Sequence, residues 1–116
     1  MKRQRAEARG RRGEALAAWW LRVHGWRIVA RRQRVATGEV DLVARRSGTL
    51  AFIEVKWRAN AADLDTAIDE WRLRRVAAAA AMLAPRLARP RENIRIDVML
   101  LAPWRLPHHL TNVWQP

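Results

Sequence analysis

The stretch 38-GEVDLVARRSGTLAFIEVKW-57 decides the fold of this chain. It contains two runs of strand-forming residues, 40–44 and 50–55, which are joined around the typical turn pair Ser47-Gly48. Both runs are almost continuously apolar instead of alternating with polar residues, and this pattern is typical of strands that are covered on both faces. We therefore predict a β-hairpin at the centre of a sheet that is flanked by helices.

Asp41 and Glu54 interrupt these apolar runs, and Glu39 and Lys56 lie directly beside them. A two-residue turn at Ser47-Gly48 would place Asp41 opposite Glu54 and Glu39 opposite Lys56. Because side chains in a strand alternate, Glu54 and Lys56 would share one face of the sheet. A turn of three or five residues would instead shift the register by one and put Asp41 and Glu54 on opposite faces.

Two opposed carboxylates within apolar strands need a positive partner, because like charges repel and an unpaired buried charge is costly. Mg²⁺ or Mn²⁺ suits such a pair, since both ions take carboxylate, carbonyl, water and phosphate oxygens as ligands. We expect Asp41, Glu54 and the carbonyl of Val55 to bind this metal, and Lys56 to polarise an attacking water or stabilise charge on a phosphate. A salt-bridged strand face without a chemical role is the alternative interpretation.

The segments around the hairpin predict the rest of the fold. Helical periodicity over residues 13–24 rests on apolar residues at three- and four-residue spacings, and Gly25 can end that helix. Strands are predicted over 26–34 and 94–101, with a short edge strand at 110–114. The order α-β-β-β-α-β predicts an α/β domain with a mixed central sheet and a helix on each face.

The second helix is predicted from a cap at Asp63 or Asp65 to about residue 84. Its expected buried stripe comprises Ile68, Trp71, Val76, Ala79 and Leu83. The first helix would bury Leu16, Trp19, Trp20 and Val23, and we expect Trp26 to join Trp19 and Trp71 in the core.

Length and charge restrict the possible functions. The chain has 116 residues, a formal net charge of +12 and no cysteine. We expect one domain over 13–116 and a flexible basic arm over 1–12, in a cytoplasmic protein without a membrane segment. The charge favours a nucleic-acid partner, although the arginine-rich composition could also reflect drift in the genome.

The hairpin residues also resemble a known family. The runs 38-GEVDLVA-44 and 52-FIEVK-56 are similar to the GE(I/V)DLIA and (V/F)EVK signatures of the YraN family, small bacterial proteins grouped with the PD-(D/E)xK nuclease superfamily. Further matches are Gly13-Glu14 at the start of the first helix, the alanine-rich second helix and 95-RIDV-98. Together these matches cover roughly residues 10–102.

This resemblance implies a restriction-endonuclease-like fold, similar to that of Holliday-junction resolvases, and Mg²⁺-dependent cleavage of phosphodiesters. It implies that Asp41 and Glu54 hold the metal and that Lys56 serves the attacking water. It also implies that Glu14 is the outer acid of the site, whereas its position alone suits an ordinary first-turn acid that favours the helix dipole. The chain departs from the family at Trp71, where the second helix usually starts with a lysine.

Three functions therefore remain open, and the third of them is a basic accessory protein that acts through protein contacts and needs neither metal nor DNA. The first is a Mg²⁺-dependent, structure-selective nuclease that acts on DNA more readily than on RNA, and by analogy as a homodimer. The second is a catalytically silent nucleic-acid-binding module that has kept the fold, which Trp71 favours. In either of the first two cases the expected backbone contacts are Arg31, Arg32, Arg58, Arg72, Arg74 and Arg75. Asp97 is expected to be a buried structural partner for an arginine.

Overall fold

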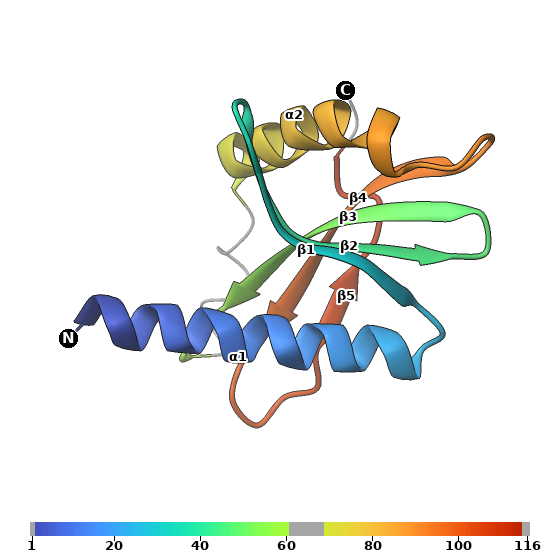
Figure 1. Ribbon diagram of the computed structural model, residues 1–116. Coiled ribbons are helices and arrows are strands. Elements are labelled where there is room, and N and C mark those ends of the chain that lie inside the picture. The colour runs from blue at the N-terminus through green and yellow to red at the C-terminus, as the bar shows by residue number, and fades with distance from the viewer. Residues whose placement is uncertain (1, 61–68, 115–116) are drawn as a thin grey trace.

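A five-stranded mixed sheet lies between two helices in the computed structural model, which describes residues 2–60 and 69–114 (Figure 1). The strands follow the order β1-β2-β3-β4-β5, and only β3 and β4 are parallel. The predicted α/β domain and its order α-β-β-β-α-β are confirmed, and the edge strand expected at 110–114 lies slightly earlier. The elements are α1 (Lys2–Val23), β1 (Arg27–Val35), β2 (Gly38–Arg46), β3 (Thr49–Trp57), α2 (Glu70–Leu87), β4 (Asn93–Leu101) and β5 (His108–Leu110).

The central hairpin has the predicted turn and register. Ser47 and Gly48 both have positive φ, 46° and 78°, as a type I′ turn requires. Pairing runs from Arg46 opposite Thr49 to Leu42 opposite Ile53. Both faces of the hairpin are buried, because α2 packs on one side of the sheet and α1 on the other.

Helix α1 packs on the sheet through a different face from the one predicted. Ala17, Ala18 and Leu21 are completely buried, whereas Trp19 and Val23 are 55% and 56% exposed. Small alanines allow the helix to lie close to the sheet, and of the predicted stripe only Trp20 packs against this side of the core. The prediction from the periodicity of the large residues is therefore wrong for the other three positions of the stripe.

The start of α1 is also corrected. Residues 1–12 were expected to form a flexible arm, but the helix begins at Lys2 rather than at Gly13. The segment 2–12 consists mostly of arginine, alanine, lysine, glutamate and glutamine, which all favour helix, so it extends the helix that is anchored by its packed half.

Helix α2 begins after Asp69, whose side chain accepts a hydrogen bond of 2.8 Å from the backbone N–H of Trp71. The expected caps Asp63 and Asp65, and Ile68, lie outside the described residues. The buried stripe follows Leu73, and at 100° per residue this places Trp71 on the opposite side of the helix. Trp71 is 62% exposed, so the prediction that it lies in the core is wrong, whereas Trp26 is buried as predicted.

The tip of the β1–β2 hairpin contacts α2 at very short range. A Cβ atom on Gly38 would lie only 2.4 Å from the carbonyl oxygen of Arg75. Next to it, the Thr37 hydroxyl donates to the sulfur of Met82 at 3.1 Å. Gly38 therefore allows α2 to approach the start of β2. Within the described ranges, no helix is both long enough and apolar enough to span a bilayer.

Candidate functional site

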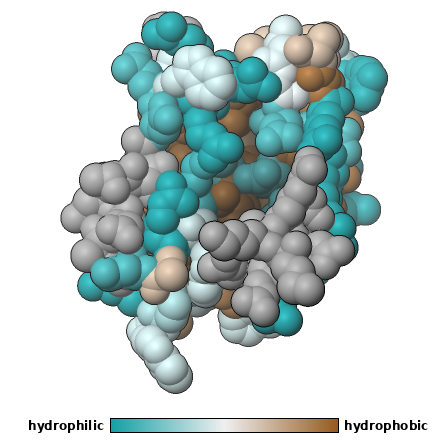
Figure 2. All heavy atoms as spheres, turned by 90° about the vertical axis from the view of Figure 1, so that its left-hand side faces the viewer, coloured by the Kyte–Doolittle hydropathy of each residue, from teal (hydrophilic) through white to brown (hydrophobic). Residues whose placement is uncertain are grey.

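A pocket opens where β2 and β3 separate. Their pairing ends at Leu42 and Ile53, although β3 continues to Trp57 and β2 begins at Gly38. Before Leu42, strand β2 pairs with β1 alone and bends away from β3. The resulting pocket has a volume of about 180 Å³ and is lined by Gly13, Glu14, Glu39, Asp41, Glu54, Val55, Lys56, Trp57 and Arg72. Figure 2 views this end of the molecule, where hydrophilic residues surround a hollow with apolar residues at its floor.

The neighbouring strand β1 is strained beside this pocket. Arg32 has a φ of 48°, a left-handed conformation that is unfavourable for a residue with a Cβ. Its neighbours Arg31 and Gln33 pair with Leu42 and Val40, so the strained residue lies opposite Asp41. The Nε of Arg32 contacts Oε2 of Glu14 on α1 at 2.6 Å. This ion pair connects the first helix to the bent part of the sheet.

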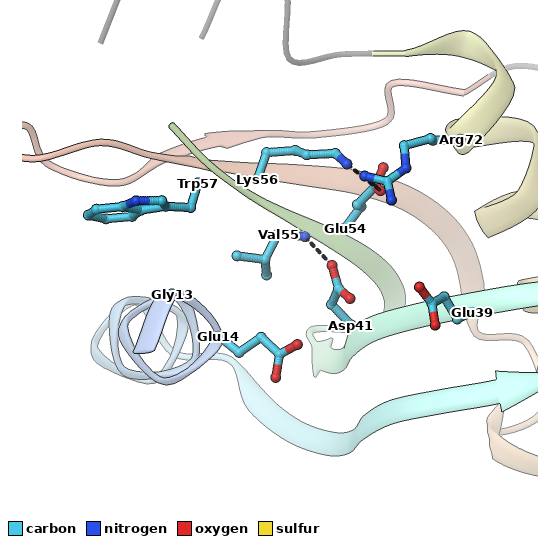
Figure 3. Close-up of a pocket in the computed structure, with 9 residues that line it drawn as sticks. All are labelled: Gly13, Glu14, Glu39, Asp41, Glu54, Val55, Lys56, Trp57 and Arg72. Atoms are coloured by element: carbon cyan, nitrogen blue, oxygen red, sulfur yellow. Dashed lines mark hydrogen bonds and ion pairs between the residues drawn. The ribbon is translucent and has the colours of Figure 1, made fainter. Parts of the chain in front are cut away.

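Asp41 lies at the point where β2 and β3 separate, which we call the fork. Its Oδ2 accepts a hydrogen bond of 2.7 Å from the backbone N–H of Val55, where a backbone acceptor of β2 would otherwise be expected (Figure 3). Burial raises the pKa of Asp41 to about 6; the Val55 bond opposes this rise, and the charges of Glu14, Glu54 and Glu39 add to it. No lysine, arginine or histidine in the described part of the chain forms an ion pair with Asp41. The site therefore contains a carboxylate whose charge is not balanced by a direct partner.

Glu54 and Lys56 project together from β3 on the α2 side of the pocket (Figure 3). The ammonium of Lys56 lies 3.0 Å from Oε1 of Glu54, and Lys56 is only 4% exposed. Arg72, in the first turn of α2, reaches to 3.9 Å from the same oxygen. The pair is thus largely removed from water, where each charge depends strongly on the other.

The carbonyl of Val55 also faces the fork. The N–H and C=O of one residue in an extended strand point to the same edge, and the N–H of Val55 points towards Asp41. The opposite edge of β3 belongs to alternate residues, as shown by the bond of 3.0 Å from the Arg58 N–H to the Leu101 carbonyl on β4. Val55 can therefore offer an oxygen ligand beside Asp41.

The predicted site residues Glu14, Asp41, Glu54, Val55 and Lys56 all line this one pocket. The expected pairing of Glu39 with Lys56 is wrong, because the strands have separated before that point. Glu39 instead pairs with Arg34 of β1 at 3.2 Å. Among the residues that the structure describes, no three His, Cys, Asp or Glu side chains are grouped so as to hold a metal ion by themselves.

The predicted backbone-binding arginines are distributed unevenly around the pocket. Arg72 lines it, and Arg32 lines an adjoining hollow. Arg74 is engaged with Glu70 at 3.7 Å, and Arg75 lies 5.2 Å from the ring of Trp71. Arg31 is exposed on β1, and Arg58 donates to the carbonyl of Trp57.

Two further arginines line the hollow beside Arg32, and sequence reasoning did not select them. They are Arg11 of α1 and Arg34 of β1. The two-residue spacing from Arg32 to Arg34 was a usable signal for a shared face. Arg11 gave no such signal, because residues 1–12 were assigned to an arm.

Asp97 has the structural role that was predicted for it. It is completely buried and accepts two bonds of 2.9 Å from Arg95, one of 2.7 Å from His109 and one of 2.9 Å from the Asn112 N–H. Burial alone would raise its pKa, but these hydrogen bonds hold the pKa below its ordinary value. The cluster joins β4 to β5 and is separate from the pocket.

Comparison with known proteins matches this chain over residues 13–101 to the family described as "Uncharacterised protein family UPF0102". A UPF0102 protein of Sphingopyxis alaskensis is 75% identical over 116 residues, which is 100% of both chains. One of Rhizorhabdus wittichii is 66% identical over 113 residues, covering 97% of this chain and 96% of that protein. One of Erythrobacter litoralis is 57% identical over 116 residues, again 100% of both. The expected similarity to a family of small bacterial proteins is confirmed.

Proposed function

The chain belongs to the protein family UPF0102, and from that premise we propose that it is a Mg²⁺-dependent nuclease of the restriction-endonuclease-like PD-(D/E)xK type. The observation that carries this proposal is one pocket that combines the unpaired carboxylate of Asp41 with the buried pair of Glu54 and Lys56. The proposed substrate is DNA with a particular structure, such as a flap or a branched junction. A homodimer and a cytoplasmic location remain expectations of the same proposal.

The donor atoms at the fork fit a hard divalent cation. Mg²⁺ needs only one or two carboxylates, because water and substrate phosphate complete its coordination. Asp41, Glu54 and the Val55 carbonyl would hold the ion. All three offer oxygen, and Oδ1 of Asp41 lies beside an Oδ2 that is already oriented by Val55. When bound, Mg²⁺ supplies charge neutralisation and increases the acidity of water.

The chain's own side chains would provide the remaining functions. The ammonium of Lys56, buried beside Glu54, can donate a hydrogen bond to the attacking water or to a phosphate oxygen. Arg72, half exposed at the pocket, can bind the phosphate that flanks the scissile bond. Water adds to phosphorus, the bond from phosphorus to the leaving oxygen breaks, and that oxygen takes up one proton of the attacking water. The products are a phosphomonoester and an alcohol.

The catalytically silent binding module is the second candidate, and a specific observation favours it. Two of the pocket acids are already neutralised by the chain, Glu14 by Arg32 at 2.6 Å and Glu54 by Lys56 at 3.0 Å. Trp71 also stands where the resemblance leads one to expect a lysine. Against this, Arg72 brings a cation from the same turn of α2 to the pocket.

A cleavage panel tests the proposal. Labelled single-stranded, duplex, flapped and four-way DNAs are incubated with Mg²⁺, Mn²⁺ or EDTA. Wild type is compared with Asp41→Asn and Glu54→Gln, and with Glu70→Gln as a control for the loss of an exposed acid outside the pocket. We expect metal-dependent cleavage that Glu70→Gln retains and both pocket variants lose. Salt-dependent binding without any cleavage would favour the silent module instead.

A further inference from the structure

Another hollow, separate from the pocket and from the hollow beside Arg32, lies at the other end of the sheet, where three turns meet. Gly25 follows α1, Ser47-Gly48 joins β2 to β3, and 89–92 joins α2 to β4; all three lie at the right of Figure 1. The Asn93 N–H donates to the Gly48 carbonyl at 2.8 Å, which fixes two of these turns to each other. We call this feature the arginine hollow; its charged lining residues are Arg27, Arg45, Arg46, Arg89, Arg91 and Glu92.

Positive charge in the arginine hollow is mostly uncompensated. Arg45 and Glu92 pair with each other, with an Nη2–Oε1 distance of 3.0 Å, and Glu92 is the only carboxylate among the lining residues. The other four guanidiniums form no ion pair with any described residue of the chain. Such a concave cluster of one sign attracts a polyanion.

One of these arginines is held in place. Arg46 donates to the His24 carbonyl at 2.9 Å and lies 4.7 Å from the ring centre of Trp26. Because its side chain is already ordered, binding a phosphate through it loses less conformational entropy than binding through a free side chain. The hollow is therefore partly preorganised for an anion.

The edge strand β1 links the arginine hollow to the pocket that contains Asp41 and Glu54, which we call the acidic pocket. Arg27 lines the hollow at the start of the strand, Arg31 is exposed along it, and Arg34 lies beside the pocket at its end. At about 3.3 Å per residue, the seven residue steps would span about 23 Å in a straight strand, and the bulge in β1 shortens the distance to roughly 20 Å. That distance corresponds to about six base pairs of duplex, which rises about 3.4 Å per pair.

We infer that the arginine hollow binds the phosphate backbone of duplex DNA at a distance from the bond that is cleaved in the acidic pocket. This inference rests on the proposed function for the position of cleavage. A duplex suits the arrangement better than a single strand, because it is stiff over this distance and keeps both contacts in register. The protein would consequently prefer duplex arms longer than about six base pairs.

The test uses two charge-matched variants. The hollow variant carries Arg27→Gln, Arg89→Gln and Arg91→Gln; the control carries Arg22→Gln, Arg86→Gln and Arg105→Gln, at exposed positions that do not line the hollow. Binding to labelled DNA hairpins with stems of about 6 and about 20 base pairs is measured by anisotropy, with Ca²⁺ in place of Mg²⁺ and across a range of salt. A single strand of the longer length is included.

We expect wild type and the control to bind the long stem at least about tenfold more tightly than the short stem. The hollow variant should lose this length preference. On the long stem, its slope of log affinity against log salt concentration should become shallower by about two to three. Equal effects of the hollow and control variants, or an equal preference of wild type for a long single strand, would overturn the inference. Metal-dependent cleavage of the flapped and four-way DNAs by wild type tests the proposed function separately.

Discussion

The carboxylate of Asp41 accepts the backbone N–H of Val55 at 2.7 Å, across the point where β2 and β3 part. The side chain is thus fixed by the main chain of the neighbouring strand and not by a cation. This arrangement keeps an acid oriented in a pocket that disfavours its charge. A site that binds a cation needs such a carboxylate, although it lowers the stability of the protein without the cation.

We predict that Asp41→Asn stabilises the metal-free protein near pH 7. Burial raises the pKa of Asp41 from 3.8 to about 6, so the folded state binds the proton more tightly than the unfolded state does. Stability therefore falls as pH rises from about 4 to 6, and the cost at pH 7 is about 1–3 kcal/mol. Asparagine removes the charge and can still accept the Val55 N–H. Urea unfolding in EDTA measures the increase in the free energy of unfolding. This increase should be smaller for Asp41→Ala, which loses the hydrogen bond.

We also predict that protons compete with Mg²⁺ at this site. The ion requires the ionised form of Asp41, whose pKa is about 6 before metal binds. Affinity measured by calorimetry should change little above pH 7 and fall by up to about tenfold per unit below pH 6. Equal affinity at pH 5 and pH 8 would contradict a role for Asp41 as ligand.

The sequence was sufficient to predict the central hairpin but not the shape of the pocket. Ser47-Gly48 fixed the turn, so the register from Arg46 to Leu42 followed from it. The same pairing rule failed beyond Leu42, because it assumes straight strands. Nothing in the residue types indicates that Arg32 has a positive φ or that β2 bends at Asp41.

Helix faces show a second limit of sequence reasoning. The stripe of α1 was predicted from large apolar residues, but Ala17 and Ala18 face the sheet and Trp19 faces outward. Packing against a sheet depends on how close the helix can lie, which hydrophobic periodicity alone does not reveal. Asp97 was easier to interpret, because an acid in an apolar strand needs a partner whatever the packing.

We predict that Gly38→Ala destabilises the protein by more than about 1 kcal/mol. The new methyl group would lie 2.4 Å from the Arg75 carbonyl oxygen, so α2 must move, and with it Arg72 at the pocket. Gly13→Ala is the matched control: its Cβ would lie 3.4 Å from Leu101, and alanine favours helix by up to about 1 kcal/mol. Thermal unfolding of both variants should show opposite shifts. A neutral Gly38→Ala would contradict the close approach of α2.

Acid should weaken the connection between β4 and β5. The pKa of Asp97 lies below its ordinary value of 3.8, so the folded state favours the ionised form. Its contribution to stability is complete above about pH 4 and is lost as pH falls through the lowered pKa. Asp97→Asn should therefore cost about 2–4 kcal/mol at pH 7 and show a smaller loss of stability in acid. Urea unfolding between pH 2 and 7 measures both, and an unchanged acid profile would contradict this role.

The buried pair of Glu54 and Lys56 gives the most direct test of whether the pocket trades stability for the proposed cation binding. Lys56→Met leaves the Glu54 carboxylate buried with only Arg72 near it, at 3.9 Å, and should cost about 2–4 kcal/mol in EDTA. Glu54→Gln leaves the Lys56 ammonium buried without its carboxylate partner, and this variant should also destabilise the protein. The double variant should recover at least about 1 kcal/mol of the summed loss, because neither charge is then left alone.

Mg²⁺ distinguishes a metal site from a structural ion pair in the same variants. In Lys56→Met, a cation bound as proposed should take the place of the missing ammonium beside Glu54. Its addition should therefore raise the melting temperature of this variant more than that of wild type, while the proposed cleavage stays lost, because in the proposed mechanism Lys56 assists the water. Ca²⁺ serves as a second cation of the same charge. If neither ion stabilises Lys56→Met more than the Glu54→Gln variant, Glu54 is a partner of Lys56 and not a ligand.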